Sequence, residues 1–153
     1  MFKDTTKFTV IIPIIDREDI VIGFPKAIKS VFDSTILPDQ VLVVVDGPVS
    51  NHFYSLIIEQ KEKYDLDLIW TKESVGLDKA LNIAISNSKN EFIFRADGDD
   101  INKPNRFEKQ IPYLENNYDL VGSHIDEFDL KGNYLASRKV PLSEAKIKKI
   151  IKF

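Results

Sequence analysis

Short apolar runs alternate with amphipathic segments over the first three quarters of the chain. The runs are nearly continuous, which is typical of strands buried on both faces of a parallel sheet, and they cover residues 8–13, 41–45, 66–70 and 91–95. The segments between them place apolar residues at helical spacing and predict helices at about residues 20–34, 52–64, 77–86 and 104–117. This alternation predicts an α/β fold, with a mostly parallel central sheet flanked by helices and joined by right-handed crossovers.

The pattern changes after residue 118. Residues 120–128 and 134–140 flank the turn residues Lys131, Gly132 and Asn133, which predicts a strand pair. A helix is predicted over residues 143–153, where one face carries the isoleucines Ile147, Ile150 and Ile151. We therefore expect a single domain over residues 1–153, made of a βα core (1–118) and a strand pair with a terminal helix (119–153).

Composition narrows the class of protein. A chain of 153 residues with 43% hydrophobic and 29% charged residues is typical of a globular domain. It has no cysteine, which excludes disulfides and thiolate chemistry, and its net charge of −3 argues against a general nucleic-acid binder. No apolar run approaches a membrane span and no signal peptide is evident. We expect a cytoplasmic protein, with peripheral contact to the inner face of the membrane through the lysine-rich last helix as an alternative.

Three carboxylates follow the fourth predicted strand within four residues, at Asp97, Asp99 and Asp100. Residues two apart on an extended backbone point to the same side, so Asp97 and Asp99 can reach one ligand together. Hard oxygen donors without a nearby Cys or His favour Mg²⁺ or Mn²⁺ over zinc. Acidic residues also initiate helices, and for Asp100 and Asn102 we prefer that interpretation.

Polar residues also follow the other three strands. They are Asp16 after the first strand, Asp46 after the second, and Glu73 with Ser74 after the third. The carboxyl ends of parallel strands meet at one edge of a sheet, where α/β proteins bind ligands. For Asp16 the sequence supports a helix cap and a binding residue equally. Neither a Gly-x-Gly-x-x-Gly nor a P-loop motif is present.

The order of these motifs resembles family 2 glycosyltransferases of the GT-A fold, which use nucleotide-activated sugars. The matching segments are Thr9–Pro13, Leu42–Gly47, Ser74–Asn82 and Arg95–Asp100, the last followed by Pro104, Arg106, Phe107 and Gln110. The resemblance implies that the chain is the donor-binding half of an inverting, metal-dependent enzyme. The enzyme would transfer sugar from a UDP-sugar to a glycan or lipid-linked acceptor, in the setting of bacterial polysaccharide synthesis.

The resemblance also assigns roles to individual residues. Pro13 and Asp16 would line the nucleoside pocket, Asp46 would accept a hydrogen bond from uracil, and Asp97 would contact the ribose. Asp99, with Asp97 beside it, would ligate Mn²⁺ or Mg²⁺ at the diphosphate. Lys79 would face the nucleotide, and Arg95 would support the acidic loop from behind.

Two motifs depart from the family pattern, and the length differs as well. Ile15-Asp16 replaces the usual aromatic-Asn pair, and a single Asp46 precedes Gly47-Pro48 instead of Asp-Asp-Gly-Ser. The general base is expected beyond residue 153, so a fragment that binds nucleotide sugar without transfer is the alternative function. A homodimer through the open sheet edge or terminal helix is expected to cover exposed apolar surface. A receiver-type signalling domain is the remaining alternative.

Overall fold

A computed structural model describes residues 6–129 and 132–150. The chain divides into two compact units, Met1–Ile111 and Pro112–Phe153. The first unit contains β1 (Phe8–Ile14), α1 (Glu18–Phe32), β2 (Gln40–Val45), α2 (Asn51–Lys63), β3 (Asp67–Trp70), α3 (Leu77–Ser86) and β4 (Phe92–Arg95). Helix α4 (Arg106–Glu115) begins in the first unit and ends in the second. The expected division into a nucleotide-binding part (1–118) and a following part (119–153) stays a prediction.

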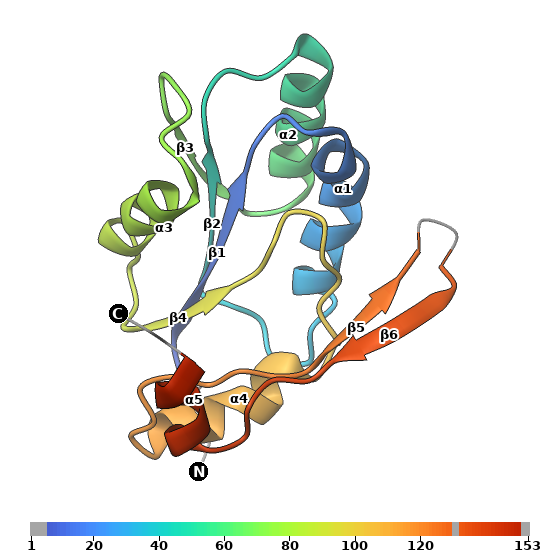
Figure 1. The fold of residues 1–153 in the computed structure, drawn as a ribbon. Helices are drawn as coiled ribbons and strands as arrows, with labels where there is room; N and C mark the ends of the chain where they lie inside the picture. The colour runs from blue at the N-terminus through green and yellow to red at the C-terminus, as the bar shows by residue number, and fades with distance from the viewer. Residues whose placement is uncertain (1–5, 130–131, 151–153) are drawn as a thin grey trace. The chain divides into compact units, whose positions relative to one another are not determined.

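The four strands of the first unit form one parallel sheet in the order β3-β2-β1-β4 (Figure 1). This confirms the predicted parallel α/β architecture. The chain adds strands in one direction up to β3 and then crosses to the other side of β1, so β1 and β4 flank the point where the strand order reverses. Ligands of open α/β sheets bind in the crevice at this point. A receiver-type domain has β1 between β2 and β3, so the observed order excludes that alternative.

Helices cover both faces of the sheet, with α3 on one side and α1 and α2 on the other (Figure 1). On the α3 face, the alternate residues Ile11, Leu42 and Val44 form a buried cluster with two alanines of the helix, Ala80 and Ala84. Small side chains let the helix approach the strands closely. On the opposite face, Phe24 of α1 and Phe53 of α2 meet edge to face with ring centroids 5.9 Å apart.

Three phenylalanines fix the start of α4 to the sheet. Phe8 of β1, Phe94 of β4 and Phe107 of α4 form a triangle with ring centroids 5.0–5.1 Å apart. All three side chains are buried, and aromatic pairs at these separations add about 0.5–1.5 kcal/mol each beyond the area they bury. This cluster therefore sets where the chain returns after β4.

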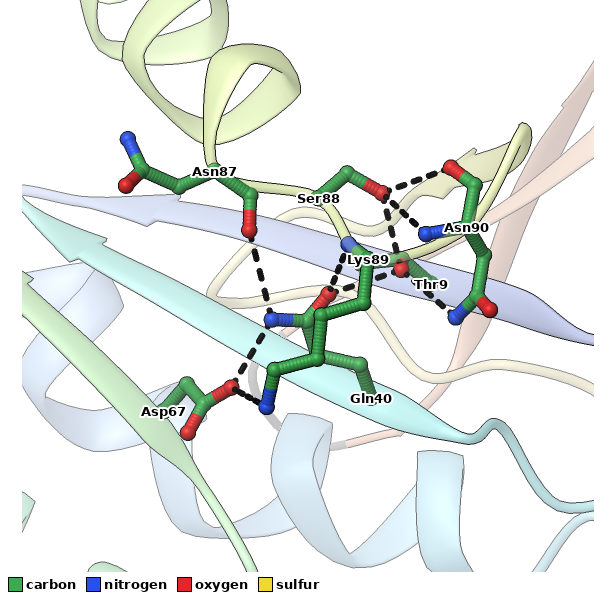
Figure 2. A network of polar contacts seen from close by, with 7 residues as sticks. All are labelled: Thr9, Gln40, Asp67, Asn87, Ser88, Lys89 and Asn90. Atoms are coloured by element: carbon green, nitrogen blue, oxygen red, sulfur yellow. Dashed lines mark hydrogen bonds and ion pairs between the residues drawn. The ribbon is translucent and has the colours of Figure 1, made fainter.

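A closed polar network joins the strands at the end where β1, β2 and β3 begin (Figure 2). Buried Gln40 is its centre: its Nε2 donates to Asp67 Oδ2 at 2.8 Å, and its Oε1 accepts from the Lys89 N–H at 2.9 Å. Lys89 Nζ also pairs with Asp67 Oδ2 at 3.0 Å. These bonds from Gln40 and Lys89 lower the pKa of Asp67. We call this group the amino-edge network; its members are Thr9, Gln40, Asp67, Asn87, Ser88, Lys89 and Asn90.

The second unit contains the antiparallel pair β5 (Ile125–Phe128) and β6 (Tyr134–Arg138), followed by α5 (Glu144–Ile150). The predicted strand pair is confirmed, although its strands are shorter than expected, with a bulge between Glu127 and Phe128. The expected continuation of α5 to Phe153, with Ile151 on its apolar face, lies outside the described residues. Over residues 6–129 and 132–150, no helix is both long and apolar enough to cross a membrane.

Candidate functional site

The loops that leave the four parallel strands lie at one edge of the sheet, which we call the carboxyl edge. It comprises residues 15–17 after β1, 46–50 after β2, 71–76 after β3 and 96–105 after β4. The parallel topology therefore places Asp16, Asp46 and the carboxylates of residues 97–100 at one edge, as predicted. The loops after β1 and β4 flank the reversal in strand order.

Two glycines allow the loop of residues 97–100, the acidic loop, to pack closely on the start of the fold. A Cβ at Gly98 would lie 2.6 Å from Ile14 Cγ2, at the end of β1. A Cβ at Gly23, inside α1, would lie 2.7 Å from the Asp99 Cα. Real Cβ atoms do not approach other atoms so closely, so a side chain at either position would displace its neighbour. The backbone of the acidic loop is thus fixed between β1 and α1.

The carboxylates of the acidic loop repel one another and have few partners. Asp97 Oδ1 accepts a bond from Arg95 Nε at 2.9 Å, which bears out the expectation that Arg95 supports the loop. Asp99 is exposed. Burial, followed by the charges of Asp97 and Asp99, raises the pKa of Asp100. Negative charge is therefore concentrated beyond what the local cations neutralise, which favours binding of a cation.

Arg106 lies behind the acidic loop and holds its ends. Its guanidinium donates to the Arg95 carbonyl at 2.8 Å, to Asn102 Oδ1 and to Gln110 Oε1 at 3.1 Å. Burial lowers the pKa of Arg106, against the opposing effect of the Asp97 and Asp100 charges. The side chain thus brings positive charge to the loop without reaching its exposed carboxylates.

The expected helix-initiating role of Asp100 and Asn102 is wrong, because α4 begins only at Arg106. Asn102 is buried, and its backbone N–H donates to Ser30 Oγ of α1 at 2.9 Å. It therefore joins α1 to Arg106. The residues between Asn102 and α4 form a turn, in which the Arg106 N–H donates to the Lys103 carbonyl.

Asp46 is the most enclosed carboxylate of the carboxyl edge, with 6% of its surface exposed. Its oxygens accept four hydrogen bonds from the loop after β3: from the Val75 N–H (2.7 Å), the Gly76 N–H (3.0 Å), Ser74 Oγ (3.0 Å) and Thr71 Oγ1 (3.2 Å). Burial acts to raise the pKa of Asp46, but these bonds outweigh it and the pKa is lowered. Asp46 thus holds the loop that leads into α3, and its expected bond to uracil stays a prediction.

Gly47 brings the same two loops together. Its φ is +90°, and a Cβ there would lie 2.9 Å from the Ser74 N atom. Glycine adopts this backbone conformation without the steric cost that other residues pay. The Gly47 N–H also donates to Thr71 Oγ1 at 2.7 Å. The contact between residues 46–47 and 71–76 is therefore specified by backbone as well as side chain.

The remaining predicted site residues lie at the same edge. Asp16 is exposed and does not cap α1; its Oδ2 accepts a bond from the Ser50 N–H at 2.5 Å, at the start of α2. Pro13 is half-buried near the end of β1, beside Val44 of β2. Lys79 is exposed in the first turn of α3. The nucleotide contacts expected for these residues stay predictions.

The donor set fits a hard divalent cation held jointly with a ligand. Among the residues that the structure describes, no three His, Cys, Asp or Glu side chains converge on a common metal position. Mg²⁺ and related ions commonly bind one or two carboxylates and complete their shell with phosphate oxygens and water. Asp97 and Asp99 can supply that number, and the close packing at Gly23 and Gly98 fixes the backbone that carries them.

Sequence reasoning missed two contributors to the site. Gly23 is hidden within a helical pattern, and Arg106 carried no assigned role although it belongs to the quoted motifs. Ser74 was expected at this edge, but its bond to Asp46 was not foreseen. The signal for Arg106 is its position shortly after an acidic cluster. Gly23 has no local signal, because only the folded backbone of Asp99 requires it.

Comparison with known proteins identifies the family. The model of glycosyl transferase family 2 matches residues 9–152. A UDP-Gal:alpha-D-GlcNAc-diphosphoundecaprenol beta-1,3-galactosyltransferase of Escherichia coli is 31% identical over 144 residues, covering 92% of this chain and 52% of that protein. The amylovoran biosynthesis glycosyltransferase AmsE of Erwinia amylovora is 32% identical over 138 residues, covering 89% of this chain and 51% of that protein. The chain therefore spans about half the length of these curated relatives.

A solved structure shares the fold. The mannosyltransferase PcManGT from Pyrobaculum calidifontis, in complex with GDP-Man and Mn²⁺, superimposes with a TM-score of 0.65 at 20% identity, covering 80% of this chain and 37% of that one. The chain belongs to glycosyl transferase family 2 and has the GT-A fold.

Proposed function

We propose that the carboxyl edge binds a UDP-sugar together with Mn²⁺ or Mg²⁺, as the donor site of a metal-dependent, inverting glycosyltransferase. The observation that carries the proposal is the acidic loop: its backbone is packed between β1 and α1, and its carboxylates are only partly neutralised. It lies where the strand order reverses, at the ligand-binding crevice of such sheets. Relatives and structural neighbours whose names include UDP-Gal, UDP-GlcNAc and GDP-Man support a nucleotide-sugar donor.

Each residue of the edge has a distinct part in this proposal. Asp99, with Asp97 beside it, would hold the metal, and Arg95 keeps the Asp97 carboxylate in place by its bond at 2.9 Å. When bound, the metal supplies a Lewis acid that neutralises charge on the diphosphate. Asp46 keeps residues 71–76 in position ahead of α3, whose exposed Lys79 would contact the nucleotide. The acceptor would be a glycan or a lipid-linked sugar.

Calorimetric titration of UDP with Mn²⁺, and again with a chelator, tests donor binding. We expect the affinity for UDP to fall at least about tenfold without metal, and the Asp99→Ala variant to show the same loss in the presence of Mn²⁺. Asp65→Ala is the matched control, because Asp65 is an exposed carboxylate just before β3, at the opposite edge. Equal UDP affinity with and without metal would contradict the proposal.

Transfer is a separate question from binding, because the chain spans about half the length of its relatives. The alternative function is a nucleotide-sugar-binding fragment without turnover. Incubating the chain with a UDP-sugar, Mn²⁺ and a sugar acceptor and measuring released UDP separates the two. Release that depends on acceptor indicates a transferase, whereas metal-dependent binding without release indicates the fragment.

A further inference from the structure

A basic cavity lies within the second unit, formed by the segment from β6 into α5 together with the loop before β5. Its volume is about 310 Å³, at the lower end of the range for small-molecule sites. The residues that line it are His124, Lys139, Val140, Pro141, Leu142, Ser143 and Lys146. None of them is acidic, although the whole chain carries a net charge of −3.

The two lysines that line this cavity belong to a basic segment whose charge is only partly neutralised. Residues 138–149 contain five Lys or Arg residues and one Glu. Arg138 is paired with Glu127, and Lys148 with Glu144. Lys139 and Lys146, by contrast, have no ion-pair partner among the described residues. The segment thus presents positive charge where the cavity is.

His124 adds a hydrogen-bond donor. Its Nδ1 accepts a bond from the Val140 N–H at 3.2 Å. A neutral imidazole that accepts at one nitrogen carries its proton on the other, so Nε2–H is left as a donor. Two ammonium groups and an imidazole N–H form a set of donors suited to phosphate oxygens.

Apart from Ser143, the rest of the lining is apolar, and this decides the source of the phosphate. Val140 and Pro141 line the cavity, and Leu142 beside them is 84% exposed. A free phosphate ion makes no use of such surface, whereas an amphiphile can pair its headgroup with the lysines and its chain with the leucine. We propose that this cavity binds the phosphate group of an anionic membrane lipid. The proposal does not depend on the nucleotide-sugar site, because it uses other residues and another ligand.

Vesicle co-sedimentation of the 153-residue chain tests the proposal. We expect binding to phosphatidylcholine vesicles only when phosphatidylglycerol is added. In the Lys139→Gln/Lys146→Gln variant we expect an about thirty-fold lower partition coefficient, because each basic residue at an anionic surface contributes roughly a factor of five. Lys26→Gln/Lys61→Gln is the matched control; it removes the same charge from exposed positions on α1 and α2 and should bind nearly as well.

The other outcomes are equally decisive. Equal losses in the two double variants would show non-specific attraction and overturn the proposal, as would no binding to either vesicle. Leu142→Ser, which keeps all charges, should also weaken vesicle binding; unchanged binding would overturn the assigned chain contact. Chemical-shift changes of Lys139 and Lys146 with inorganic phosphate, in a chain that does not sediment with vesicles, would instead show a free phosphate site. Circular dichroism of each variant controls for folding.

Discussion

The two edges of the parallel sheet differ in whether their carboxylates are paired with donors of the chain. At the amino edge, the Asp67 carboxylate accepts bonds from Gln40 and Lys89, and its pKa is lowered. At the carboxyl edge, three carboxylates lie within four residues, and burial together with its neighbours raises the pKa of Asp100. The amino edge pairs its carboxylate within the chain, whereas the acidic loop at the carboxyl edge leaves carboxylates only partly neutralised.

Asp46 shows that position alone does not decide which behaviour a residue has. It lies at the carboxyl edge, yet it accepts four hydrogen bonds from residues 71–76 and is almost fully enclosed, like a member of the amino-edge network. The edge therefore combines a rigid part, built around Asp46 and Gly47, with an exposed acidic part. A binding site needs both, since a preorganised scaffold holds the charged groups in position.

The largest effect on stability is expected from Asp46→Asn. The amide keeps one acceptor oxygen and places an NH₂ group opposite protein donors, so buried N–H groups lose their partner. We expect a loss of about 2–4 kcal/mol in the free energy of unfolding, measured by urea denaturation at neutral pH. The folded pKa of Asp46 is lowered, so its contribution is present above the unfolded pKa of about 3.9 and is lost as the pH falls through the folded pKa. The difference between wild type and variant should therefore narrow in acid; an equal difference at all pH values would contradict this account.

Gly23→Ala should have the next largest effect, and it acts on the acidic part. Alanine favours the helical backbone of α1 by about 1 kcal/mol, but its Cβ would meet the Asp99 backbone at 2.7 Å. Overpacking of this kind costs about 1–3 kcal/mol, so we expect a net loss of stability and weaker metal-dependent UDP binding. Gly122→Ala is the control, because a Cβ there has no neighbour within 4 Å. Unchanged UDP binding in Gly23→Ala would show that the loop does not need this packing.

Asp46 also illustrates which parts of the structure can be predicted from the sequence and which cannot. The elements follow from local patterns: nearly continuous apolar runs on the parallel strands and helical spacing between them, together with turn residues such as Gly47. The edge at which Asp46 and Asp99 lie follows from parallel topology. The four partners of Asp46 do not, because they are 25–30 residues away and depend on how one loop folds over another. Asn102 was misjudged for the same reason, since its partner Ser30 is 72 residues away.

Asp67→Asn tests the contribution of the amino-edge network to stability. It should lower the free energy of unfolding by less than Asp46→Asn does. The amide oxygen can still accept from Gln40, so the main loss is the ion pair with Lys89, whose side chains are 69% and 45% exposed. Exposed pairs contribute about 0–1 kcal/mol, and we expect a loss of about 1 kcal/mol in urea denaturation. Lys89→Gln should account for most of that loss. UDP affinity should be unchanged in both variants; a fall in affinity would show that the two edges are coupled.

The smallest effect should have the opposite sign. Asp100→Asn removes a carboxylate that is disfavoured by burial and by the charges of Asp97 and Asp99. With a chelator present, we expect the variant to melt about 1–3 °C above wild type. Adding Mn²⁺ should reduce this difference in Tm. In wild type, a cation bound at the acidic loop would itself relieve the repulsion among the carboxylates. Asp65→Asn, which removes an exposed carboxylate at the other edge, should leave Tm unchanged. A lower Tm for Asp100→Asn than for wild type in chelator would mean that the Asp100 carboxylate stabilises the fold. The contrast between paired carboxylates at the amino edge and repelling ones in the acidic loop would then be wrong.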